Sequence, residues 1–321
     1  MQVRRTLATV IATSTVLLGA ACAGDDLSKD SANPSGSDST AGTGDKGAVK
    51  ISGQNFPEAT LVASMYEQLL DAKGYDASVT LVGTRDVYMA KGQFPDGVQV
   101  VPEYVGGILD FLNTTANGPK AEPITTSDAA ASIAAGQSLL EDKGITLLDP
   151  STASDTNAFF VSKDYADSEG VSKLSDLEGK SVKLAAAPDC KGRSDCEGGL
   201  TDVYGIDITE LLPLGYASEQ TYKSVLDGES QLGETSTTDG ALESQGLVLL
   251  EDDKAIQPAQ NLVPAVSSAW IADHQDAADA LNALMAALTT EKLTELNGQV
   301  TVDRAQPEDV AKSFLEDEGL I

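Results

Sequence analysis

The chain has 321 residues, with 50 acidic residues against 21 lysines and arginines, so its formal net charge is −29 at pH 7. A charge this negative excludes nucleic-acid binding as the main activity, because contacts to phosphate require a basic surface. It also disfavours adsorption to anionic lipid through charge alone.

The first residues have the pattern of a secretory signal peptide. Arg4 and Arg5 form a short basic region, and an apolar run from Leu7 to Leu18 leads through small residues to Cys22. The run is too short to span a bilayer stably. The end of this segment resembles a bacterial lipobox, although a glycine replaces the usual aliphatic residue three positions before the cysteine. We therefore expect residues 1–21 to be removed and Cys22 to be lipidated; the alternative is ordinary cleavage nearby, which would leave a free thiol.

A polar segment follows the expected lipidation site. Between residues 23 and 46 there is no aromatic and no β-branched aliphatic side chain, so the segment has little to bury. We expect residues 22–46 to form a disordered tether that holds the rest of the protein at the outer face of the cell membrane. The remaining chain is long enough for one large domain or two lobes.

Apolar strands and helices alternate through the rest of the chain. Pro57 begins the first helix, where the missing N–H costs nothing, and Gly74 ends it. Helices are expected at 57–73, 127–143, 219–226, 237–244, 276–288, 291–296 and 307–318. Strands are expected at 48–52, 78–82, 99–104, 145–148, 157–161, 181–185, 210–214 and 247–250. This alternation predicts an α/β fold with largely parallel sheets.

Catalytic motifs are absent from the sequence. His274 is the single histidine, and there is no nucleophile elbow, zinc-protease motif, phosphate-binding loop or dinucleotide fingerprint. We therefore expect no enzyme activity, no cofactor and no metal site, and a hydrolase with an unrecognised site is the alternative. The two remaining cysteines, Cys190 and Cys196, are most simply a disulfide that closes a small loop in an exported protein.

Six short blocks between residues 47 and 321 occur in a recognisable order. They are QNFPE (54–58), PEYVGG (102–107), APDCKGRSDC (187–196), TTDG (237–240), LLEDDK (249–254) and the segment 288–303. Together they resemble the osmoprotectant-binding proteins of ABC importers, the family that captures glycine betaine, choline and carnitine. The resemblance implies a two-lobed type II periplasmic-binding-protein fold with a ligand cleft between the lobes.

The resemblance also implies how the chain is divided. Lobe I should contain residues 47–153 and 262–321, and lobe II residues 154–261. Two crossing strands should join the lobes near 150–156 and 261–264. Such a protein is expected to work as a monomer that delivers its solute to ABC permease subunits.

The family holds a quaternary ammonium group between aromatic rings, because this group cannot donate a hydrogen bond; each face contributes about 0.5–2 kcal/mol when desolvated. When the cage positions of the family are compared with this sequence, Tyr104 matches one ring of the aromatic cage. Asn157, Ser236 and Gln260 stand at the other three ring positions. Three of the four cage positions are therefore polar in this chain, which implies a ligand that forms more hydrogen bonds than betaine.

Three further positions correspond to ligand contacts in the family. Arg193 stands where the family has an arginine that binds the ligand carboxylate, and therefore favours a ligand with an anionic end. Gln54 is a polar residue in the first block, and Gly107 replaces a threonine that can also touch the carboxylate.

Three other aromatic residues are candidates to replace the lost rings. Phe159 lies two residues from Asn157 on the same strand face, and Tyr216 and Tyr222 follow later in the chain. The alternative is that all three pack in the core.

The sequence thus predicts a lipid-anchored binding protein that delivers a small polar or zwitterionic solute to an ABC importer. One alternative is a sensor or interaction lipoprotein with the same fold. A second is that the polar replacements have abolished ligand binding.

Overall fold

In a computed structural model of the protein, residues 46–321 are described. The expected signal peptide, Cys22 and nearly all of the expected tether lie outside this part of the chain. Within residues 46–321, no helix combines the length and the apolar character needed to cross a membrane.

The first lobe is built on a sheet with the strand order β2-β1-β3-β10-β4. These strands are β1 (Ala48–Gln54), β2 (Asp76–Val82), β3 (Val100–Tyr104), β4 (Ile145–Leu147) and β10 (Leu262–Ser267). β1 is parallel to β2 and β3, whereas β10 is antiparallel to β3 and β4.

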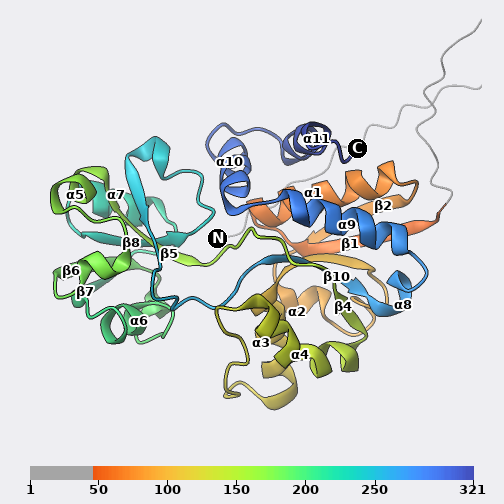
Figure 1. The fold of residues 1–321 in the computed structure, drawn as a ribbon, viewed down its shortest axis with the longest axis horizontal. Coiled ribbons are helices and arrows are strands. Elements are labelled where there is room, and N and C mark those ends of the chain that lie inside the picture. Colours follow the sequence, from red (N-terminus) through yellow and green to blue (C-terminus); the bar gives the residue numbers. More distant parts are fainter. Residues whose placement is uncertain (1–45) are drawn as a thin grey trace, which may run out of the picture. The chain divides into compact units, whose positions relative to one another are not determined.

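Helices cover both faces of this sheet (Figure 1). One face carries α1 (Pro57–Ala72), α9 (Gln275–Ala287), α10 (Thr290–Thr301) and α11 (Pro307–Asp317). The other carries α3 (Val105–Asn117) and α4 (Ala129–Lys143). Leu61, Met65 and Leu69 of α1 are fully buried against the sheet, which accounts for the apolar stripe read from the sequence.

The second lobe repeats the plan with the strand order β7-β6-β8-β5-β9. Its strands are β5 (Asn157–Ser162), β6 (Ser181–Ala186), β7 (Asp207–Pro213), β8 (Leu232–Ser236) and β9 (Leu247–Leu250). β6 is parallel to β7 and β8, and β5 is antiparallel to β8 and β9. The helices here are α5 (Lys163–Glu169), α6 (Glu197–Asp202) and α7 (Glu219–Leu226).

Short helical elements complete the fold. They are α2 (Arg85–Tyr88), α8 (Ser268–Ile271) and 3-10 turns at Leu174–Leu177, Pro188–Cys190 and Glu243–Gln245.

Two chain segments cross between the lobes side by side. Ser154 and Asn261 form an antiparallel bridge, the Asp155 N–H donates to the Gln260 carbonyl at 3.1 Å, and the Leu262 N–H donates to the Ala153 carbonyl at 3.0 Å. The two-lobed fold expected from the sequence is confirmed, while the residue boundaries given for the lobes stay a prediction.

The helix α10 of the first lobe also touches the second lobe. The Asn297 amide donates to the Thr238 carbonyl at 3.0 Å, and the Thr294 hydroxyl donates to the Thr237 carbonyl at 3.4 Å. Gly240 lies against Gly298 so closely that a Cβ on Gly240 would sit 2.4 Å from the Gly298 nitrogen. Only glycine fits at residue 240 without moving the helix.

Two expectations about secondary structure were wrong. The expected helix at 237–244 is a turn in which the Asp239 carboxylate accepts the Ala241 N–H at 2.9 Å, and only Glu243–Gln245 is helical. An aspartate that bonds to nearby backbone in this way favours a turn over a helix. The sheets are mixed and not largely parallel, because each contains one strand, β10 or β5, that runs against its neighbours.

Candidate ligand-binding site

Three cavities lie between the lobes. The first, which we call the carboxylate cavity, has a volume of about 590 Å³. It is lined by Phe56, Pro57, Glu58, Asp155, Tyr216, Ala217, Tyr222, Ser236, Thr238, Asp239, Gly240, Ala241, Asn297 and Thr301. The second, which we call the Asp195 cavity, has a volume of about 510 Å³. It is lined by Asp110, Pro123, Thr125, Thr126, Ser127, Ser194, Asp195, Ala255, Ile256, Gln257 and Pro258. A larger hollow of about 890 Å³ beside α10 contains none of the site residues expected from the sequence.

Glu58 is the most buried carboxylate of the carboxylate cavity, with 5% of its surface exposed. The Tyr104 hydroxyl donates to its Oε1 at 2.5 Å, and the Asn297 amide donates to its Oε2 at 2.5 Å. Burial raises the pKa of Glu58, and these hydrogen bonds oppose the rise. The Tyr104 ring is stacked on Phe56, with 6.2 Å between ring centroids. Tyr104, expected as a cage ring, therefore also positions a buried acid.

Asp155 is a second carboxylate of this cavity and belongs to one of the crossing segments. Burial, together with the nearby charge of Glu58, raises the pKa of Asp155 to about 7. Its Oδ1 atom is buried and has no hydrogen-bond partner. The nearby hydroxyls of Ser236 and Thr238 oppose the rise in the pKa of this carboxylate. An unpartnered buried acceptor is costly, so Oδ1 is a candidate to accept a hydrogen bond from a ligand.

The aromatic side chains of the carboxylate cavity come from the second lobe and from the end of β1. The Tyr222 hydroxyl donates to Asp239 Oδ2 at 2.6 Å, and Tyr216 is 43% exposed. Phe159, by contrast, is 1% exposed and belongs to the core of the second lobe. Of the three rings considered as replacements for the lost cage, Tyr216 and Tyr222 line a cavity and Phe159 does not.

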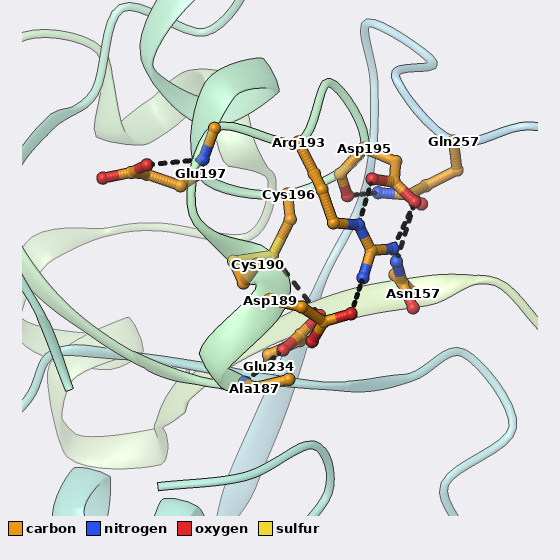
Figure 2. The surroundings of a disulfide bond; sticks show 11 residues. Asn157, Ala187, Asp189, Cys190, Arg193, Asp195, Cys196, Glu197, Glu234 and Gln257 are labelled. Carbon is orange, nitrogen blue, oxygen red and sulfur yellow. Dashed lines mark hydrogen bonds and ion pairs between the residues drawn. A yellow bond between two sulfur atoms is a disulfide. The ribbon is translucent and has the colours of Figure 1, made fainter. Parts of the chain in front are cut away.

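The structure contains the expected disulfide between Cys190 and Cys196. The loop that it closes carries Arg193, which Figure 2 shows between two aspartates. The Arg193 Nε and Nη2 atoms donate to the two oxygens of Asp195 at 2.9 and 2.6 Å, and Nη1 donates to Asp189 at 3.2 Å. The Asn157 amide donates to the same Asp195 at 3.1 Å. A carboxylate of the chain thus occupies the fork of the arginine expected to bind a ligand carboxylate.

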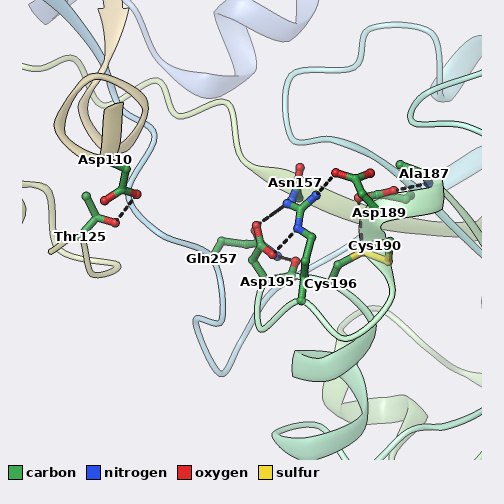
Figure 3. A network of polar contacts seen from close by, with 11 residues as sticks. Asp110, Thr125, Asn157, Ala187, Asp189, Cys190, Asp195, Cys196 and Gln257 are labelled. Carbon is green, nitrogen blue, oxygen red and sulfur yellow. Dashed lines mark hydrogen bonds and ion pairs between the residues drawn. A yellow bond between two sulfur atoms is a disulfide. The ribbon is translucent and has the colours of Figure 1, made fainter. Parts of the chain in front are cut away.

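The Asp195 cavity separates this loop from the first lobe. Figure 3 shows Asp110 and Thr125 on one side, and Asp195 and Gln257 on the other. The Thr125 hydroxyl donates to Asp110 Oδ2 at 2.9 Å, and the Gln257 amide donates to the Asp195 carbonyl at 2.8 Å. The other side-chain oxygens, Asp110 Oδ1 and Gln257 Oε1, are buried without a partner.

The remaining expected site residues lie at strand ends and at the crossing. Ser236 and Asn157 are direct partners in the β5–β8 pair, so their side chains lie on the same face of the sheet. Gln260 accepts the Gly107 N–H at 3.0 Å, and Gln54 is half-buried at the end of β1. Of the seven expected ligand contacts, Ser236 alone is among the residues that line the two cavities.

The glycine at position 107 has a local explanation. A Cβ there would lie 2.5 Å from Nη2 of Arg85, whose guanidinium donates twice to Glu103 at 2.9 Å. This buried ion pair fills the space that a threonine side chain would need.

The sequence did not single out Glu58, Asp155, Asp239 and Asn297 as site residues. Glu58 belongs to the QNFPE block, Asp239 to the TTDG block and Asn297 to the block 288–303, which is the only local signal. The four side chains come from different parts of the chain, and the fold alone brings them together.

Comparison with known proteins identifies the family of the chain. The family described as "Substrate binding domain of ABC-type glycine betaine transport system" matches residues 47–317. The chain belongs to this family. It is therefore a substrate-binding protein of a glycine-betaine-type ABC transporter and not an enzyme.

Relatives of known name agree with the family. A glycine-betaine-binding protein of Pseudomonas aeruginosa is 26% identical over 292 residues, which cover 88% of this chain and 91% of that protein. Among solved structures, a glycine betaine/carnitine/choline ABC transporter protein has a TM-score of 0.73 at 19% identity, covering 85% of this chain and 98% of its own. Apo YehZ from Escherichia coli has a TM-score of 0.71 at 21% identity, with coverage of 85% and 99%. These structures show the same fold.

Proposed function

We propose that this protein captures a small polar solute between its lobes and presents it, as a monomer, to the permease subunits of an ABC importer. A polar solute is supported because three positions that are aromatic in the family carry polar side chains in this chain. Asn157 and Ser236 face the same side of their sheet, and the Gln260 carboxamide binds backbone at the crossing. Ser236 lines the carboxylate cavity, and its hydroxyl offers a donor and an acceptor where a ring would offer only a π face.

A thermal-shift panel tests this function. A solute that binds only the folded protein raises its melting temperature by mass action. The panel should contain betaines, amino acids, polyols and small amines, each at millimolar concentration. We expect at least one solute to raise the melting temperature. If no solute does so, and equilibrium dialysis with the same panel also finds no binding, the proposed capture of a small polar solute is wrong and a sensor or interaction role is favoured.

We further propose that Cys22 carries a lipid that anchors the protein at the outer face of the cell membrane. The position of Cys22 after an apolar signal-like run and before a polar tether supports this. We expect Cys22→Ala to release the protein from the membrane fraction or to stop processing. Cell fractionation with intact-mass measurement checks the result, and membrane retention at unchanged mass in the variant would contradict lipidation.

A further inference from the structure

The walls of the space between the lobes carry only one sign of charge. Carboxylates of Glu58, Asp155 and Asp239 line the carboxylate cavity, and those of Asp110 and Asp195 line the Asp195 cavity. Among the described residues that line these two cavities there is no lysine, arginine or histidine. The nearby arginine, Arg193, is already bound by aspartates of its own loop.

Carboxylates alone do not define a site, and a second observation points to the chemistry of the ligand. Within residues 46–321, the buried side-chain atoms without a hydrogen-bond partner are oxygens of Asp110, Asp155, Gln257 and Asn297. Every one of them belongs to a residue that lines one of the two cavities. All are acceptors, so what the cavities lack is donors.

The Asn297 side chain shows this most clearly, because its orientation is fixed. Asn297 is 7% exposed, and its amide nitrogen donates to both Glu58 Oε2 and the Thr238 carbonyl. Both partners are acceptors, so the nitrogen must lie on their side, and Oδ1 is left as the free end. Asn297 thus presents an unpartnered buried acceptor at the wall of a cavity that also carries three carboxylates.

We infer that the ligand of the carboxylate cavity is a cation with N–H donors, such as a primary ammonium or guanidinium group, and that it carries no carboxylate. This inference rests on the proposed capture of a small solute and names its class. Asn297 and Asp155 accept from the N–H groups, and the ring faces of Phe56 and the cavity tyrosines cover the alkyl part. A quaternary ammonium would leave the free acceptors unpartnered, and a carboxylate would face further carboxylates.

Because the pKa of Asp155 is raised, the affinity for the cation should depend on pH. The charged and titratable groups that face Asp155 are Glu58 from α1, Asp239 from the turn after β8, and the hydroxyls of Tyr104 and Tyr216. The hydroxyls of Ser236 and Thr238 also lie beside it and favour its ionised form. A bound cation stabilises the ionised carboxylate, so the ligand binds more tightly as the pH rises through about 7. Below that pH, binding of the ligand releases up to about one proton from Asp155.

The test compares monovalent cations that differ in their N–H groups. Calorimetry of the purified protein with ethanolamine and with choline, which carry the same charge, should give at least tenfold tighter binding for ethanolamine. Agmatine, a dication in this pH range, should bind as a guanidinium probe. Repetition at pH 6 and pH 8, in buffers of different ionisation enthalpy, should show tighter binding and proton release with agmatine, whose charge does not change in this range. Equal or tighter binding of choline would overturn the inference, as would binding of neutral glycerol at the same strength.

Two variants test whether the cation binds in the carboxylate cavity. Asp155→Asn keeps the shape of the side chain and should weaken agmatine binding at least tenfold and remove the proton release. Asp273→Asn is the control, because Asp273 is an exposed acid outside both cavities and its replacement changes the net charge equally. Equal effects of the two variants would mean that only the overall charge attracts the cation. If other solutes of the panel bind but no amine does, the inference fails while the proposed function stands.

Discussion

Glycine betaine is expected to bind the unmodified protein with a Kd of about 1 mM, and the double variant Asn157→Tyr/Ser236→Tyr to bind it at least tenfold more tightly. The two residues are direct partners in the β5–β8 pair, so two rings there would stand side by side on one face. Each added face contributes about 0.5–2 kcal/mol to a desolvated quaternary ammonium, which together is about one to three decades in Kd. Calorimetry with glycine betaine measures the gain.

The control for this pair is Asn157→Leu/Ser236→Leu, which fills the same space without π faces. Gln260 is left unchanged, because its side chain accepts the Gly107 N–H and a tyrosine there would lose that bond. The hydrogen bond from Asn157 to Asp195 is lost equally in the tyrosine and leucine variants, so the comparison between them cancels its loss. The two tyrosine substitutions should act non-additively, since a cage requires both faces around one volume. Micromolar betaine binding by the unmodified protein would show that Tyr216 and Tyr222 already form a cage.

The second expected result concerns Arg193. Asp195→Ala should tighten the binding of glycine betaine roughly ten- to a hundredfold, because it frees two donors of the guanidinium for the ligand carboxylate. Hydrogen bonds to charged groups contribute about 1.5–3 kcal/mol, which corresponds to that range. Choline has no carboxylate, so its affinity should change much less. The ratio of the two dissociation constants is the measurement.

Asp189→Ala provides the matched control. It removes the same charge from the same arginine, but the Asp189 side chain is 76% exposed and forms one contact of 3.2 Å. This variant should change the betaine-to-choline ratio only slightly. An unchanged ratio in Asp195→Ala would show that Arg193 does not reach the ligand at all.

Much of the fold follows from the sequence, because its strands and helices have clear periodicity. Each expected strand has a counterpart, and the helix expected at 219–226 has the same bounds as α7. The strands that were missed have physical reasons. β10 contains Pro264, which is unusual inside a sheet, and β8 is a short run with the buried acid Glu234 at its centre. The helix α3, which was also missed, has two glycines, Gly106 and Gly107, in its first turn, and glycine is a poor helix former.

The site was harder to predict than the fold. The family blocks indicated strand ends and the arginine loop, and the structure places these residues near the crossing or in the second lobe. They did not show that Asp195 is bound to Arg193, because a bond between side chains two residues apart has no signature in the sequence. Nor could 50 acidic residues reveal that Glu58, Asp155 and Asn297 meet, since 239 positions separate Glu58 from Asn297 along the chain.

The contact of α10 with the turn after β8 has a mechanical consequence for capture. The crossing segments, this contact and a hydrogen bond from the Ala259 N–H to the Thr126 carbonyl at 2.8 Å attach the lobes, and both Asn297 and Thr238 belong to the wall of the carboxylate cavity. A rotation of one lobe against the other that preserves these bonds must have its axis close to them. Displacement grows with distance from the axis, so Glu58, which accepts from Asn297, and Asp155, which lies on a crossing segment, keep nearly fixed positions. The acceptors that would hold a cation are therefore already in place before the lobes close.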